Sequence, residues 1–163
     1  MKRFYRKEHA LEDDKLCCII NSQMQEFLRR IGASEVDCSK CGKFDDMDIC
    51  TIYTTIDGAY NIRLVFCAER ALLQHIADCM MGEPVTDPED VEECAKEFFN
   101  EVCGHIVAEI FKETHYSARF HCPFFREGYF LPGNNGEKML VHCYTSVHKE
   151  SAVFMHDPLT KIS

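Results

Sequence analysis

The sequence has no apolar stretch approaching the roughly 20 residues that a membrane-spanning helix requires. The basic residues near its start, such as Lys2 and Arg3, are followed by no apolar segment or cleavage site, so we expect no signal peptide. Positive charge is also scarce, because 18 Lys and Arg stand against 27 Asp and Glu and leave a net charge of −9. A phosphate backbone repels such a chain. We therefore expect a cytoplasmic protein that enters no membrane, binds no nucleic acid and has a protein or small-ligand partner.

Internal repeats and low-complexity tracts are absent as well, and no composition shift marks a second domain. The length of 163 residues suits one domain. We expect residues 1–12 to form a charged, flexible leader and residues 13–163 to form the single domain.

Cysteine is abundant, with 11 residues, but no signal for an oxidising compartment accompanies it. Most of these thiols are expected to act as small core hydrophobes. Cys38 and Cys41 have the spacing of half a zinc site, which Cys50 or a histidine could complete. Because there is no second CxxC pair, two ordinary thiols in a strand–turn segment are the preferred interpretation. No metal site is predicted.

Histidines offer a second alternative. His115 and His121 share one face of a predicted strand, and His142 and His148 share one face of another. If the two strands were neighbours, the imidazoles could bind a metal or titrate near neutral pH. A nucleophilic pair of Cys122 with His121 is a weaker hypothesis, because adjacent strand residues point to opposite faces.

Hydrophobic periodicity predicts the elements of an α+β fold. Apolar residues recur at helical spacing over 13–31, where Gly32 can end the helix. Asp57-Gly58 separates strand-like runs at 48–56 and 59–66, which is typical of a hairpin with one buried face. The other expected elements are a strand near 34–43, helices at 68–81 and 87–112, and strands at 115–122, 126–131, 138–148 and 151–155. We expect one antiparallel sheet with the second and third helices packed on it.

The helix predicted from Asp87 to Lys112 carries the strongest functional pattern. Asp87 can cap it and Pro88 suits its first turn. One face is apolar and should meet the core: Val91, Ala95, Phe98, Phe99, Val102, Ile106 and Ile110. The opposite face carries Glu93, Glu97, Asn100 and Gly104. A mid-helix glycine costs about 0.5–1 kcal/mol relative to alanine, so a bare patch at Gly104 is what the close approach of another molecule would need.

Glu97 and Asn100 have complementary chemistry. The carboxylate accepts hydrogen bonds and can pair with a cation, whereas the amide both donates and accepts. An amide can therefore hold a water by donating to a phosphoryl oxygen and accepting from the water. The alternative is that both residues are merely solvated on an outer face.

The run Glu97-Phe98-Phe99-Asn100-Glu101-Val102-Cys103-Gly104 resembles the Glu-x-x-Asn-x-x-x-Gly helix motif of the CheX/CheC chemotaxis phosphatases. It follows a predicted helix ending in Met81-Gly82-Glu83 and precedes the segment 123–128, in the order that this family has. The resemblance covers roughly residues 13–155, and its single motif points to the CheX-like branch.

This resemblance implies a phosphatase that hydrolyses the aspartyl phosphate of a CheY-like response regulator. Asn100 would orient the attacking water and Glu97 would pair with the regulator's active-site lysine, while Glu93, Glu101 and Gly104 would contact the partner. The Mg²⁺ would belong to the regulator, so no cofactor is expected in this chain. A homodimer joined through edge strands is also implied. The rival hypothesis is a non-catalytic CheX-like binding or dimerisation module.

Overall fold

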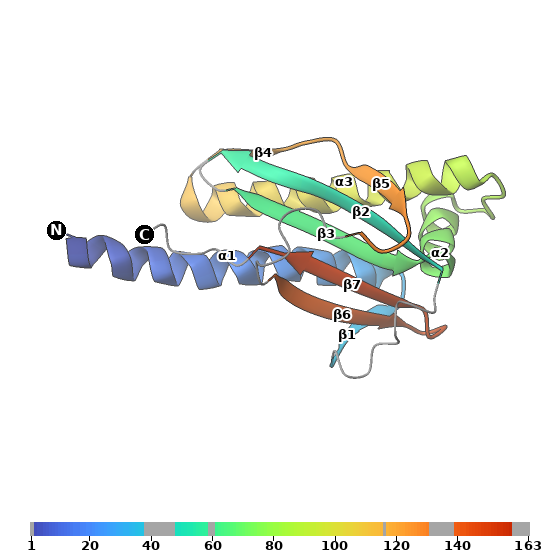
Figure 1. Cartoon of the computed structure of the whole chain (residues 1–163), viewed down its shortest axis with the longest axis horizontal. Coiled ribbons are helices and arrows are strands. Elements are labelled where there is room, and N and C mark those ends of the chain that lie inside the picture. The colour runs from blue at the N-terminus through green and yellow to red at the C-terminus, as the bar shows by residue number, and fades with distance from the viewer. Residues whose placement is uncertain (1, 38–47, 59–60, 116, 131–138, 158–163) are drawn as a thin grey trace.

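Figure 1 shows the computed structural model of the chain, which describes residues 2–37, 48–58, 61–115, 117–130 and 139–157. Its helices are α1 (Lys2–Arg30), α2 (Arg70–Met81) and α3 (Pro88–Thr114). Its strands are β1 (Ala33–Val36), β2 (Ile49–Gly58), β3 (Ile62–Glu69), β4 (Ala118–Phe120), β5 (Phe124–Glu127), β6 (Leu140–Ser146) and β7 (Ser151–His156).

One antiparallel sheet contains the strands in the order β1-β6-β7-β3-β2-β4, and β5 pairs with the other part of the same edge of β2. Helices α1 and α3 run along one face of this sheet, and α2 lies at one end of it (Figure 1). The predicted α+β class is confirmed. Only the second and third helices were expected on the sheet, but α1 also belongs to the helical layer. Its stripe of Leu16, Ile20, Met24 and Leu28 is at most 1% exposed.

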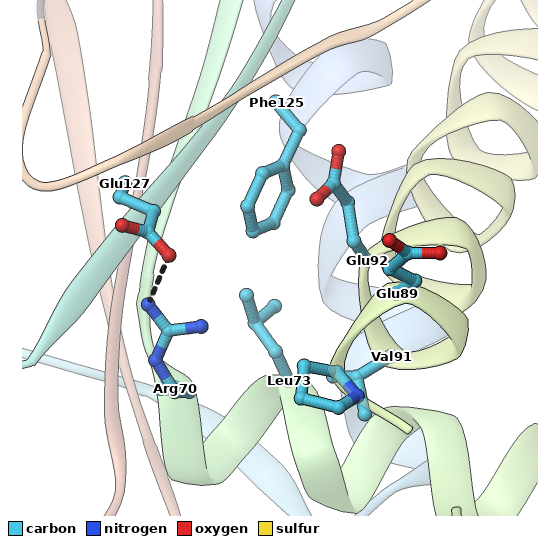
Figure 2. Close-up of a pocket in the computed structure, with 8 residues that line it drawn as sticks. Arg70, Leu73, Glu89, Val91, Glu92, Phe125 and Glu127 are labelled. Atoms are coloured by element: carbon cyan, nitrogen blue, oxygen red, sulfur yellow. Dashed lines mark hydrogen bonds and ion pairs between the residues drawn. The ribbon is translucent and has the colours of Figure 1, made fainter.

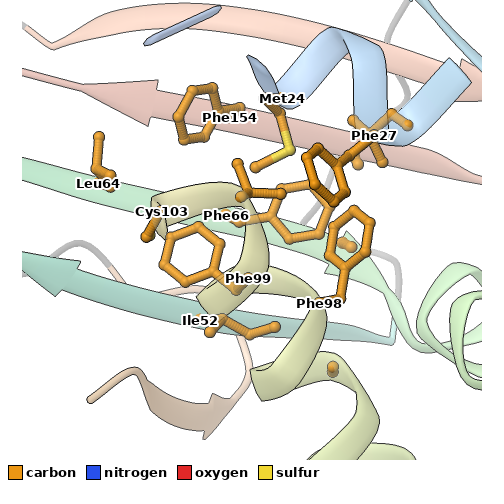
Figure 3. Close-up of a cluster of buried hydrophobic side chains, with 14 of the residues drawn as sticks. Met24, Phe27, Ile52, Leu64, Phe66, Phe98, Phe99, Cys103 and Phe154 are labelled. Carbon is orange, nitrogen blue, oxygen red and sulfur yellow. The ribbon is translucent and has the colours of Figure 1, made fainter. Parts of the chain in front are cut away.

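Phenylalanines connect α3 to the rest of the core (Figure 3). The ring of Phe66 on β3 lies 6.1 Å from that of Phe98 and 6.4 Å from that of Phe99. Phe27 of α1 meets Phe98 edge-on at 6.0 Å. The predicted apolar face of α3 is buried as expected, with Cys103 added to it. Because side chains advance about 100° per helical residue, the opposite face of α3 points to solvent.

Strand β3 is buried on both faces, whereas one buried face was predicted. Ile62, Leu64 and Phe66 face the helices, and Val65 and Cys67 belong to a second cluster on the other face. All five are 0% exposed. The reason is topological, because β3 lies between β7 and β2 in the interior of the sheet. Met155 and Val153 of β7 lie opposite Val65 and Cys67 and pack beside them on the second face, so alternation along β3 alone underestimates its burial.

Two predicted boundaries are wrong. Helix α1 begins at Lys2 rather than near Asp13, so the backbone of the expected leader is helical; no Gly or Pro precedes Gly32 to interrupt it. The predicted hairpin forms, because β2 pairs with β3 from Ile49 opposite Glu69 to Ile56 opposite Ile62. Asp57 and Gly58, however, belong to β2 and pair with Arg119 and Ala118 of β4. A side chain at position 58 would collide with the neighbouring chain, since its Cβ would lie 2.7 Å from the carbonyl oxygen of Ser117.

The connection from α2 to α3 fixes where α3 begins. Gly82 ends α2 in the left-handed conformation, with φ at +69°. The Asp78 carboxylate accepts hydrogen bonds from the Val85 backbone N–H at 2.8 Å and the Gln74 amide at 2.9 Å, and these bonds lower the pKa of Asp78. Asp87 then caps α3 by accepting from the Glu89 N–H at 2.9 Å. The start of α3 was therefore predicted correctly, and its axis is held against the core.

Candidate functional site

The solvent face of α3 carries the two residues predicted to be catalytic. Glu97 is exposed and Asn100 is half-buried, while the residues on the opposite side of the helix are buried. Residues three apart on a helix are neighbours, with Cβ atoms about 5–6 Å apart. Glu97 and Asn100 therefore project side by side, Glu97 exposed to solvent and Asn100 with part of its surface buried.

Neither Glu97 nor Asn100 forms a hydrogen bond or ion pair with the rest of the described chain. As far as the described residues go, their polar atoms are available to a partner. Glu93, one turn earlier, differs because it lies 2.7 Å from the Lys96 ammonium. This contact raises the pKa of Lys96 and gives Glu93 a cationic neighbour on its own helix. Glu97 forms no such pair within the described residues, so its carboxylate can receive a cation from outside.

Lys96 had no role among the sequence-based predictions, although its i,i+3 spacing from Glu93 signals this pair. It also lies 3.8 Å from Glu92. Glu101, predicted to contact the partner, is exposed on the side of α3 next to Glu97.

Gly104 leaves a gap on the same face. A Cβ added there would meet no atom within 4 Å. Packing within the described chain therefore does not require glycine, and the cost of a mid-helix glycine is not offset by a local fit. The gap adjoins Asn100, one turn away, and extends the open surface on which another molecule could rest.

Gly104→Ala is expected to raise the free energy of unfolding by about 0.5–1 kcal/mol, because alanine favours the helix and its methyl group has open space. Urea denaturation of the two proteins at the same pH measures the difference. A lower stability in the alanine variant would show that the position is crowded after all.

A cleft of about 230 Å³ opens beside the first turns of α3. Figure 2 shows Arg70 and Glu127 on one side of it and the carboxylates of Glu89 and Glu92 on the other. Arg70 is engaged by Glu127 at 3.3 Å and by Asp48 at 2.9 Å. The arginine is therefore neutralised locally, and the cleft extends the acidic character of the α3 surface.

The alternative histidine cluster does not form in the described residues. Strand β4 pairs with β2 at one edge of the sheet, whereas β6 pairs with β1 and β7 toward the other. His115 caps the end of α3 with φ at +60°, and His121 contacts Asp57. The ring of His148 lies 5.2 Å from that of His75 of α2 and is tilted by 55° to it. The strand order, which no local pattern reveals, separates the two pairs that the hypothesis needed together.

His142 stacks on His156 of the neighbouring strand, with ring centroids 5.4 Å apart and planes 11° apart. The Nε2 atoms of both rings are buried without a hydrogen-bond partner in the described structure. Burial lowers the pKa of His156 to about 4. The Nδ1 of His142 lies 3.1 Å from Glu35, and the Nδ1 of His156 lies 3.2 Å from the Asp157 carbonyl oxygen. This pair was not predicted, because His156 lay beyond the expected strand end.

Cysteine does not provide a site in the described part of the chain. Cys38 and Cys41 lie outside the described residues, so the half zinc site cannot be placed. Cys50 is fully buried, and burial raises its pKa. Cys122 is exposed beside His121, whose ring contacts Asp57 instead. Within the described ranges, no three His, Cys, Asp or Glu side chains come together as a metal site.

Comparisons with known proteins agree with this arrangement. The family model described as chemotaxis phosphatase CheX matches residues 50–129, a range that contains α2 and α3. No curated protein sequence matches the chain. No helix in the described residues has the length and apolar character needed to cross a membrane.

Solved structures share the fold. Chemotaxis protein CheX from Vibrio vulnificus matches with a TM-score of 0.69 and 14% identity, over 88% of this chain and 98% of that one. CheX in the CheX–CheY–BeF3–Mg²⁺ complex from Borrelia burgdorferi matches with a TM-score of 0.61 and 13% identity, over 85% and 94%. FliY from Thermotoga maritima matches with a TM-score of 0.59 and 15% identity, over 89% and 88%. Since proteins with different names share this fold, the activity has to be argued from the side chains of α3.

Proposed function

We propose that this chain, which is CheX-like, removes the phosphoryl group from the phosphorylated aspartate of a CheY-like response regulator. The observation that carries the proposal is the pairing of Glu97 and Asn100 on the solvent face of α3, where both polar groups are free of partners in the described chain. The match of the chemotaxis phosphatase CheX model to residues 50–129, which include this pair, supports the same function.

In the proposed reaction, α3 enters the active site of the docked regulator. The Asn100 amide accepts a hydrogen bond from the attacking water and donates one to a phosphoryl oxygen. The water oxygen attacks phosphorus, and the bond between phosphorus and the aspartyl oxygen breaks. The products are inorganic phosphate and the free carboxylate of the regulator. Asn100 itself takes up no proton, because an amide has no useful pKa; its contribution is to hold the water in line.

Glu97 has a docking role in this proposal. Its carboxylate would pair with the active-site lysine of the regulator, and its exposure leaves it free to do so. The Mg²⁺ that neutralises the phosphoryl charge would come with the regulator, and this chain is expected to supply no metal ligand. Gly104 would give the regulator room to approach the helix, since the space beside it is open.

A homodimer and a cytoplasmic location also belong to the proposal. The outer edge of β1 and the edge formed by β4 and β5 end the described sheet, and either could pair with a second copy. Phosphorylated response regulators are the proposed substrate, which puts the protein in the same compartment as them.

The test is to mix the purified chain with a phosphorylated receiver domain and follow phosphate release. Wild type is expected to accelerate the loss of phosphate over the receiver alone. Glu97→Gln should lower kcat/KM by about tenfold or more, because a charge-assisted hydrogen bond contributes about 1.5–3 kcal/mol. Binding of the receiver with no acceleration by wild type would support the rival hypothesis of a non-catalytic module.

A further inference from the structure

A large apolar side chain lies on the same face of α3 as the proposed catalytic pair. Phe111 is 50% exposed although phenylalanine is normally buried, and it is not part of the core clusters. About five helical turns of 3.6 residues separate it from Glu93, so the two point in the same direction. Glu93, Glu97, Asn100, Gly104 and Phe111 thus form one line along the helix, called here the α3 stripe.

The α3 stripe changes character along its length. Its first half is acidic through Glu93 and Glu97, with Glu101 beside them, and its second half continues from Gly104 to Phe111. The exposed Ala108 flanks that second half and adds only a methyl group. The ring of Phe111 touches one described ring, that of His115, edge-on at 6.3 Å. Aromatic residues are enriched in protein contact surfaces, and Phe111 lies in line with the pair proposed to meet the receiver.

We propose that Phe111 is a second anchor for the receiver domain, packing against an apolar patch on the receiver beside its phosphorylation site. The inference rests on the proposed function. Phe111 lies about 16 Å along the helix axis from Asn100, at a rise of 1.5 Å per residue. A small domain is about 30 Å across, so a receiver centred over α3 between Asn100 and Phe111 can contact both. The acidic half then meets the lysine side of the receiver and the apolar half sets its orientation.

A second copy of this chain suits the α3 stripe less well. In a symmetric dimer of antiparallel helices, the acidic half of one copy would meet the apolar half of the other. The carboxylates of Glu97 and Glu101 would then be covered by Phe111 without a cation, which opposes association. Two chains that each carry a net charge of −9 also repel one another. A partner that offers a cation beside an apolar surface fits both halves.

Steady-state dephosphorylation of the receiver by Phe111→Ala tests the proposal. The KM is expected to rise about ten- to thirtyfold, as for an aromatic interface anchor, while kcat at saturating receiver stays within about twofold. Phe111→Leu should recover much of the lost affinity. The urea midpoint of Phe111→Ala should match wild type, because the side chain is half-exposed. The matched control is Phe124→Ala, a 59% exposed phenylalanine that stacks on Tyr53 away from the α3 stripe; its KM should not change.

The outcomes separate the two proposals. If wild type fails to accelerate phosphate loss, the proposed function is wrong. If wild type is active and Phe111→Ala keeps the wild-type KM, the proposed phosphatase function is supported and the proposed role of Phe111 as an anchor is wrong. A change from dimer to monomer in Phe111→Ala with an unchanged KM would assign the surface to a second copy and also overturn the anchor.

Discussion

Asn100→Ala is expected to slow dephosphorylation of the receiver by on the order of 10²-fold or more at saturating receiver. The alanine variant loses both hydrogen bonds that hold the water in line with the phosphorus. The helix is not expected to suffer, because the Asn100 side chain bonds to no described neighbour and alanine is a better helix former. Single-turnover phosphate release, with the chain in excess over the phosphorylated receiver, measures the chemical step directly.

Two variants make that result specific. Asn100→Asp keeps the size but replaces the N–H donors with a charged oxygen facing the phosphoryl group, so it should be at least as slow as alanine. Asn61→Ala, an exposed asparagine before β3, should behave as wild type. An Asn100→Ala protein that keeps wild-type turnover would rule out water positioning by this amide, even if receiver binding were intact.

Stability is expected to fall by on the order of 3 kcal/mol as the pH drops from 6.5 to 4, through His156 alone. Burial is the main cause that lowers the pKa of His156 from 6.5 to about 4 in the folded protein, and the neighbouring His142 lowers it further. Between these values the unfolded chain binds a proton that the folded chain does not. Stability from this residue is therefore complete above pH 6.5 and is lost as the pH falls toward 4.

Urea denaturation at pH 7 and pH 5, with wild type and His156→Gln, tests this pH dependence. Glutamine does not titrate, so the difference between the two pH profiles isolates His156. The other groups at the site, including His142 and the Arg63–Asp157 ion pair at 2.6 Å, are present in both proteins. If the free energy of unfolding changes with pH in the same way in both proteins, His156 keeps an ordinary pKa in the folded state.

The solvent face of α3 could be predicted because a helix has a fixed period. Every residue predicted to face the core, from Val91 to Ile110, is buried, and Glu97 is exposed. The same period would have placed Phe111 on the α3 stripe. Its role was missed because hydrophobicity alone does not distinguish an exposed phenylalanine from a core residue.

The predicted hairpin is confirmed, since β2 pairs with β3 from Ile49 opposite Glu69 to Ile56 opposite Ile62, but the prediction that both strands exclude Asp57-Gly58 failed for a different reason. Asp57-Gly58 is a strong local turn signal, yet β4 pairs alongside it and keeps both residues in β2. The competing interaction comes from a segment about 60 residues later in the chain, as the Gly58–Ala118 pair shows. Local propensity does not predict a pairing partner that is about 60 residues away in the sequence. The stacking of His142 on His156 was not predicted for the same reason.

The sequence by itself determined the helix with one buried side and one polar side, the α+β class, and the two residues proposed to act on phosphate. Periodicity and capping depend on neighbours within a few residues, so they can be recognised in the sequence. Only the tertiary structure decided that β3 is buried on both faces and that the histidines pair across β6 and β7. Those outcomes depend on rotamers and strand order, which packing between distant segments selects.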